Sequence, residues 1–143
     1  MLDFLFTAID DQVINFQTLE MTEKSNQYLV LPEGQYKAEP HEISPVLKVS
    51  AEDLKKYFVE VAERQEKVEL IRTSADGKQL DFVQRTPLMG YPDTITVRFI
   101  GQDSDTSTLA IYSRSSYGYS DLGANAERVK EWLEQLQKSL PAQ

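Results

Sequence analysis

Four short β-type runs in the middle of the chain constrain its fold more than any other feature of the sequence. Residues 94–100 and 108–114 alternate between apolar and polar side chains, which is typical of strands with one buried face. Residues 67–73 and 78–85 flank Asp76-Gly77, and such a pair favours a tight hairpin turn because the turn requires a positive φ. Consecutive strands with short links predict an antiparallel meander.

Two amphipathic helices are predicted, one on each side of these strands. Apolar residues recur at helical spacing in residues 51–65, and Ser50 with Asp53 three positions later resembles a capping box. Residues 125–138 show the same spacing, with Asn125 as the expected N-cap. The pattern predicts an α+β fold, with an antiparallel sheet of four or five strands and two main helices packed on one face. The expected core is Ile95, Val97, Phe99, Leu109 and Ile111 with Leu54, Phe58, Val61, Val129, Trp132, Leu133 and Leu136.

The N-terminal part of the chain has a different character. Residues 1–42 hold eight carboxylates and two lysines, so they form an acidic segment ahead of an α+β domain at 43–143. We expect a short helix followed by extended chain within residues 1–20. Four breakers, Pro32, Gly34, Pro40 and Pro45, predict irregular chain over residues 21–47. With 143 residues in all, the chain is expected to form one globular domain.

Composition excludes several classes of site. The chain has no cysteine, which excludes disulfides, thiolate zinc sites, iron–sulfur clusters and cysteine nucleophiles. Its one histidine, His41, excludes a histidine-rich metal centre and is expected to face solvent in a loop. We therefore expect no metal and no cofactor. A net charge of −8 disfavours nucleic acid and anionic membranes as partners. With no membrane span and no signal peptide in the sequence, a cytoplasmic location is expected.

The densest group of polar residues lies between the last predicted strand and the last helix, at residues 113–128. It holds serines, tyrosines, an aspartate and an asparagine, and two glycines that suggest positive φ or a close approach of backbone. Arg114 and Arg128 supply positive charge suited to bidentate binding of an anion. A connection of this length and composition is more than a simple turn requires.

This stretch resembles a known family. Residues 112–129, YSRSSYGYSDLGANAERV, are similar to the C-terminal Ser-Arg…Gly-Tyr-Ser-Asp-x-Gly-x-Asn-x-x-Arg-Val pattern of domain-of-unknown-function family 1499, found in bacteria and plastids. Residues 85–93, RTPLMGYPD, resemble a second element of that family. The resemblance spans about residues 45–137 and implies a bacterial protein, but it implies no activity. The family's Pro-Asn-Cys-Val-Ser-Ser motif is absent, and residues 25–28, SNQY, stand at about its place.

Two interpretations of the matched residues remain open. In the first, Asp121 and Asp93 bind Arg114 and Arg128, and the loop is a buried polar clasp between strand and helix. In the second, the same side chains line a pocket for a small polar or anionic ligand. The candidate site residues are Asp93, Arg98, Ser113, Arg114, Gly118, Tyr119, Ser120, Asp121, Gly123, Asn125 and Arg128.

Three hypotheses about function follow. The leading one is a non-enzymatic binding or interaction module with its site at residues 113–128. The alternative is a metal-independent hydrolase or lyase that uses Asp121, Tyr119 and Arg114. The third is a homodimer in which the N-terminal segment docks on a neighbouring chain.

Overall fold

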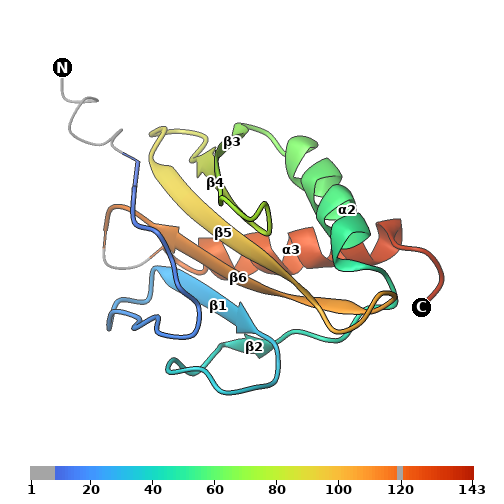
Figure 1. Ribbon diagram of the computed structural model, residues 1–143. Coiled ribbons are helices and arrows are strands. Elements are labelled where there is room, and N and C mark those ends of the chain that lie inside the picture. Colours follow the sequence, from blue (N-terminus) through green and yellow to red (C-terminus); the bar gives the residue numbers. More distant parts are fainter. Residues whose placement is uncertain (1–8, 119–120) are drawn as a thin grey trace.

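The protein folds as one sheet covered by helices on one side. The computed structural model describes residues 9–118 and 121–143. The strands are β1 (Gln27–Leu31), β2 (Glu42–Ile43), β3 (Val68–Thr73), β4 (Gln79–Arg85), β5 (Pro92–Gly101) and β6 (Ser107–Ser115), and the helices are α2 (Ala51–Glu63) and α3 (Ala124–Ser139). The sheet has the strand order β2-β1-β6-β5-β4-β3 (Figure 1).

The predicted meander is confirmed, but the sheet is larger than expected. Strands β3 to β6 pair in sequence order and antiparallel, and the Ala75–Gly77 region forms the turn between β3 and β4, with Gly77 at φ 73°. Two further strands come from residues 21–47, which the proline and glycine content had marked as irregular. Because β1 pairs antiparallel with β6 and parallel with β2, the sheet has six strands and is mixed.

The sequence of β1 does not show the alternating pattern by which a strand is usually recognised. All five of its residues, QYLVL, are buried, so no alternation distinguishes one face from the other. The breakers Pro32 and Gly34 lie just beyond its end. The short β2 is held against β1 by the backbone, since the N–H groups of His41 and Ser44 donate to the carbonyl oxygens of Leu29 and Leu31, each at 2.8 Å.

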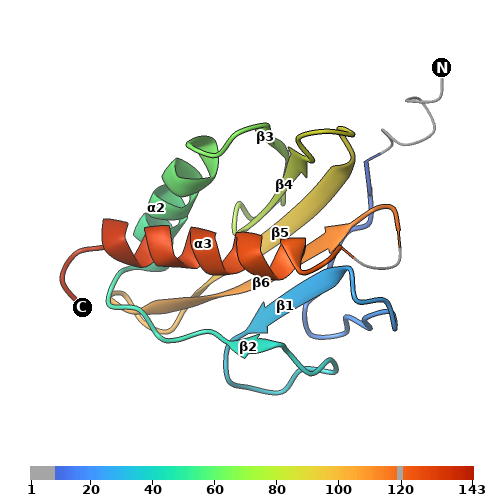
Figure 2. The same ribbon diagram turned by 180° about the vertical axis from the view of Figure 1, so that it is seen from behind.

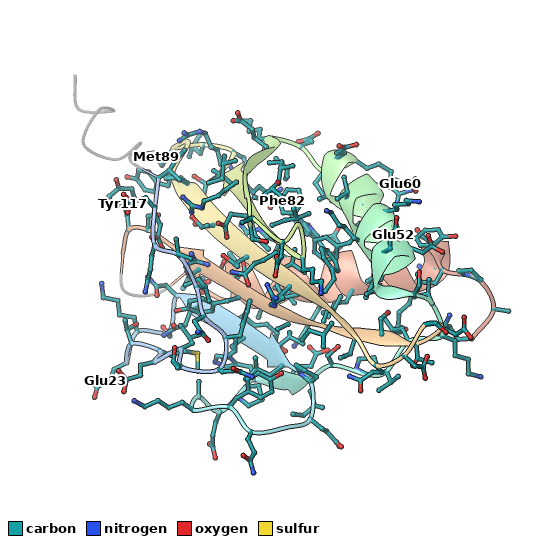
Figure 3. The ribbon with its side chains drawn as sticks, in the orientation of Figure 1. Glu23, Glu52, Glu60, Phe82, Met89 and Tyr117 are labelled. Carbon is teal, nitrogen blue, oxygen red and sulfur yellow. The ribbon has the colours of Figure 1, made fainter. Side chains whose placement is uncertain are left out.

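One face of the sheet, here called the helix face, packs against α2 and α3. Figure 1 shows α3 behind the sheet, and Figure 2 shows it in front. Phe58 from α2 and Trp132 from α3 lie edge to face with ring centroids 5.9 Å apart, and Phe82 from β4 packs on both. Figure 3 shows Glu52 and Glu60 on the outer side of α2, away from Phe82. Every predicted core residue lies in this cluster, with Leu133 only partly buried.

The opposite face, here called the second face, is covered by the N-terminal segment. Ile14, Phe16 and Leu19 pack there against Leu29 and Tyr112. Residues 9–20 form no helix and contain only a turn at 16–18, which agrees with the extended chain expected there; the short helix expected earlier in residues 1–20 falls largely on residues 1–8, outside the residues that the structure describes. The apolar side chains of this extended chain are buried directly against the sheet. Figure 1 shows this segment crossing the sheet on the side away from α3.

Both helices begin at defined residues. The Ser50 side chain caps α2 by accepting a hydrogen bond from the Asp53 N–H at 3.1 Å, as predicted. Helix α3 begins one residue earlier than predicted, with Gly123 at the N-cap position in a left-handed conformation, φ 85°. The expectation that Asn125 is the N-cap is therefore wrong. In the part of the chain that the structure describes, no helix is long and apolar enough to cross a membrane.

Candidate functional site

The first of three groups of candidate residues lies on the helix face where β6 leads into α3. Five buried or nearly buried residues from β5, β6, α3 and the chain just before β1 meet there and are called the helix-face cluster: Asn26, Asp93, Ser113, Asn125 and Arg128. Alternation along the strands places Asp93 and Ser113 on this face, in line with Ile95 and Ile111.

Asn125 is the centre of the helix-face cluster and has no exposed surface. Its Nδ2 donates to the Asn26 carbonyl oxygen at 3.1 Å and to Ser115 Oγ at 3.0 Å. Its Oδ1 accepts from Ser113 Oγ at 2.6 Å and from Arg128 Nη1 at 2.7 Å. A buried amide is favourable only when its donors and acceptors are paired, and here both ends are. Asn125 therefore ties α3 to β6 and to the chain before β1.

Arg128 and Asp93 form the ion pair of this cluster. Arg128 Nη2 lies 2.6 Å from Asp93 Oδ2, and the two side chains are 10% and 3% exposed. The same guanidinium donates from Nε to Gln84 Oε1 at 2.5 Å. One arginine of α3 thus contacts both β4 and β5. This part of the clasp interpretation, an Asp93–Arg128 bond, is confirmed.

Asp121 bonds neither arginine, and that part of the clasp interpretation is wrong. Its carboxylate accepts hydrogen bonds from the backbone N–H groups of Gly123 and Asn125, at 2.8 and 2.9 Å, and from Asn125 Nδ2 at 2.6 Å. Burial acts to raise the pKa of Asp121, but the hydrogen bonds from Asn125 and Gly123 outweigh it and the pKa is lowered. Asp121 has the role predicted for Asn125, since it satisfies the free N–H groups at the start of α3.

The loop glycines have the conformations that the sequence suggested. Gly118 and Gly123 have φ of 84° and 85°, in the left-handed region that suits glycine. The Gly118 carbonyl oxygen accepts a hydrogen bond from Asn26 Nδ2 at 2.6 Å, which holds the loop to the chain before β1. Tyr119 and Ser120, two further candidates, lie outside the residues that the structure describes.

Arg114, in the second group, lies on the opposite side of the sheet. It follows Ser113 on β6 and so points to the second face, where its Nε donates to Asp10 Oδ2 at 3.1 Å. Its Nη1 donates to Thr96 Oγ1 at 2.9 Å, and its guanidinium lies 4.8 Å from the centre of the Tyr112 ring. Asp121 and Arg114 therefore do not share the single centre that the hydrolase or lyase hypothesis requires.

Arg98 makes a third, separate contact. It lies on the second face near the β3–β4 turn, where its Nη2 is 2.8 Å from Asp76 Oδ2. Both side chains are partly exposed. Hydrogen bonds from Ser74 and Arg98 and from the Lys78 N–H lower the pKa of Asp76. Arg98 thus fixes the hairpin turn to β5 and is not part of the helix-face cluster.

Two pockets accompany these groups. A pocket of about 340 Å³ lies beside the helix-face cluster, with Asp93, Gln84 and Arg128 in its wall next to Trp132; it is called the helix-face pocket. A pocket of about 690 Å³ lies on the second face between residues 13–17 and the β3–β4 turn, and Arg98 lines it. Of the candidate site residues that the structure describes, only Asp93 and Arg128 line the helix-face pocket.

A family match covers most of the chain. The model of the family described as a protein of unknown function, DUF1499, matches residues 7–136. The chain belongs to the DUF1499 family. The match begins well before residue 45, where the resemblance in the sequence was expected to start, so it includes Asp10 and Asn26. No curated protein and no solved structure matches the chain.

The site of this DUF1499 protein includes residues that sequence reasoning missed. Asn26 lies in the stretch SNQY that the sequence comparison expected at the place of the missing motif, but it was not among the candidate site residues. Gln84, Thr96 and Asp10 carried no local signal, because their partners are set by the pairing of distant strands.

Residues suited to a metal ion are not grouped in this DUF1499 structure. Within residues 9–118 and 121–143, no three histidine, aspartate or glutamate side chains lie close enough together to hold one. His41 is exposed, and its Nδ1 accepts a hydrogen bond from the Leu29 N–H at 2.9 Å. This bond fixes the loop before β2 against β1.

Proposed function

We propose that this DUF1499 protein is a non-enzymatic binding module that holds a small polar ligand in the helix-face pocket. The observation that carries the proposal is the position of the Asp93–Arg128 pair. The pair is almost fully buried, yet both residues line a pocket that opens to solvent. A buried ion pair is expensive to maintain, and a site that presents one to a pocket is suited to recognition of polar groups.

The size of the pocket limits the ligand. A volume of about 340 Å³ is near the lower end of the range for small-molecule sites. Trp132 supplies an apolar wall, and Gln84 supplies amide groups beside Arg128. A compact molecule with one flat or apolar side and several hydrogen-bonding groups fits this lining.

The rim of the pocket carries charges of both signs. Lys67 and Arg85 line it on the strand side, while Glu127 and Glu131 line it from α3. Because Glu127 and Glu131 are one helical turn apart, they lie on the same side of the helix. A ligand with both a negative and a positive group would meet an opposite charge at each wall. A ligand with a charge of one sign would bind nearer the wall that carries the opposite sign.

The clasp supports binding rather than competing with it. Asn125, Ser113 and Asn26 hold α3 against the sheet with paired hydrogen bonds, and so they fix Arg128 and Asp93 before a ligand arrives. A preformed site loses little conformational entropy on binding. The two interpretations of the loop are thus compatible, with the clasp forming one wall of the pocket.

A fluorescence screen tests the proposal. Trp132 is the only tryptophan of the chain and lines the pocket, so a bound ligand changes its emission. We expect a subset of small polar compounds to change the emission of the natural protein and of Glu134→Phe, and not that of Glu127→Phe. Glu127 lines the pocket, whereas Glu134 is an exposed residue of the same helix outside it. A response that Glu127→Phe retains would contradict this site.

A further inference from the structure

Three buried polar atoms without partners gather at one end of the second face. They are Thr94 Oγ1, Arg114 Nη2 and Ser116 Oγ, and in residues 9–118 and 121–143 these are the buried side-chain nitrogen and oxygen atoms that make no hydrogen bond. Thr94 and Arg114 are direct cross-strand partners on β5 and β6. Ser116 is two residues beyond Arg114. Directly opposed residues have Cα atoms about 5 Å apart, so these atoms belong to one place.

Buried groups of this kind need an explanation. An unpaired donor in the interior loses its hydrogen bonds to water without replacement, and the loss is larger for a charged group. Arg114 is only 5% exposed and Thr94 is fully buried. Natural structures seldom leave three such atoms together unless something binds them.

Asp10 forms only one of the two hydrogen bonds that a carboxylate can form with the guanidinium of Arg114. A carboxylate that matches arginine well takes two parallel hydrogen bonds, from Nε and Nη2 together. Asp10 takes only the bond from Nε, at 3.1 Å, through Oδ2. Its Oδ1 accepts instead from the Gln12 N–H at 2.8 Å. In the described residues, the Nη2 half of the fork therefore has no hydrogen-bond acceptor.

The surrounding charges favour exchange of Asp10 for another anion. Asp81 on β4 pairs with Arg72 on β3, with Oδ2 2.6 Å from Nε, and also accepts a hydrogen bond from Thr96 Oγ1. That pair is neutral, and among the described residues Asp10 is the carboxylate that forms an ion pair with Arg114. An additional anion beside Asp10 would leave excess negative charge in a buried place, whereas an anion in place of Asp10 keeps the balance.

We propose that Arg114, Thr94 and Ser116 form a binding site for an oxyanion, a carboxylate or phosphate group, that replaces the side chain of Asp10. The oxyanion accepts from Nε and Nη2 of Arg114 through two oxygens and from the hydroxyl groups of Thr94 and Ser116. This site is on the opposite face of the sheet from the helix-face pocket and does not depend on it. Asp10 acts as a built-in competitor on the N-terminal segment.

Calorimetric titration with inorganic phosphate and, separately, acetate at matched ionic strength tests the site. Asp10→Asn removes the competitor, and we expect it to bind at least one probe about tenfold or more tightly than the natural protein. Asp11→Asn is the matched control, because Asp11 is the exposed neighbour and the change in net charge is the same. Tighter binding of phosphate would identify the oxyanion as a phosphate group, and tighter binding of acetate would identify it as a carboxylate.

Thr94→Val locates the binding and does not depend on how well Asp10→Asn folds. It removes only the unpaired hydroxyl group, so the fold is retained and the affinity for the preferred probe is expected to fall about tenfold in either background. Asp10→Asn that binds neither probe more tightly than Asp11→Asn would overturn the proposal. An affinity unchanged by Thr94→Val would overturn it as well, and would leave a trapped water as the partner of these atoms.

Discussion

Ser113 and Arg114 are neighbours in the chain but belong to separate networks on opposite faces of the sheet. Ser113 Oγ donates to Asn125 Oδ1 at 2.6 Å beneath α3, whereas Arg114 Nε donates to Asp10 Oδ2 at 3.1 Å on the second face. The alternation of side chains along β6 requires this division. The polar segment at 113–128 therefore serves two places in the molecule rather than one.

Asp93→Asn is expected to destabilise the protein strongly. The substitution keeps the shape of the side chain but leaves the buried guanidinium of Arg128 without its counter-charge, which typically costs about 3–5 kcal/mol. The free energy of unfolding from urea denaturation, followed by circular dichroism, measures the effect. Arg98→Gln is the control, because it breaks the partly exposed pair with Asp76 and should cost less than about 1 kcal/mol. Equal losses in the two variants would contradict the assignment of Asp93–Arg128 as the buried pair.

Asp121→Asn is expected to cost less than about 1 kcal/mol at pH 7, because asparagine caps a helix about as well as aspartate. The hydrogen bonds from Asn125 and Gly123 lower the pKa of Asp121, so its contribution is complete above the ordinary aspartate pKa and is lost as the pH falls through the lowered value. The difference in unfolding free energy between the natural protein and the variant should therefore shrink as the pH falls from 5 toward the acid limit. A loss as large as that of Asp93→Asn would show that Asp121 pairs with an arginine after all.

Trp132→Ala is expected to cost about 3–5 kcal/mol, because the ring is buried among Phe58 and Phe82 and the variant leaves a cavity. The midpoint of chemical denaturation measures this loss. Leu88→Ala, at a side chain that is 92% exposed, is the matched apolar control and should leave the midpoint unchanged. An unchanged denaturation midpoint in Trp132→Ala would mean that α3 packs against the sheet with a different side of the helix.

Thr94→Val and Thr96→Val are expected to have opposite effects on stability. The two residues lie on the same face of β5, but Thr96 Oγ1 donates to Asp81 and accepts from Arg114, whereas Thr94 Oγ1 has no partner in the described chain. In a buffer without phosphate or carboxylate, Thr94→Val should stabilise the protein by about 0.5–1 kcal/mol and Thr96→Val should destabilise it by about 1–3 kcal/mol. Thermal denaturation of both variants measures the two effects. A loss of stability in Thr94→Val would show that the Thr94 hydroxyl group is already paired in the natural protein.

Local patterns in the sequence determined much of the fold. The alternation in residues 94–100 and 108–114 placed Ile95, Val97 and Ile111 on the helix face correctly, because one buried face imposes a period of two. The helical spacing around Trp132 identified the buried side of α3 for the same kind of reason. β1 could not be found in this way, since both of its faces are buried and its sequence has no alternation.

The partners of the candidate residues were harder to predict because they depend on strand pairing. Asp121 lies close to both arginines in the sequence, yet Arg128 pairs with Asp93, 35 residues away, and Arg114 with Asp10, 104 residues away. Asn125 was predicted to lie at the start of the last helix, and it does lie in the first turn of α3. Its role as a buried hydrogen-bonding centre was not predicted. Its side chain points inward because Ser113, Arg128 and Asn26 together satisfy it there.

Native mass spectrometry of the freshly purified protein tests the helix-face pocket most directly and also reports whether the chain is a monomer or the homodimer of the third hypothesis. We predict that a small molecule is retained by the natural protein and by Glu134→Phe and is missing from Glu127→Phe, whose new side chain fills the pocket. A retained molecule of the same mass in Glu127→Phe, or none in any of the three after incubation with a mixture of small polar metabolites, would contradict the account.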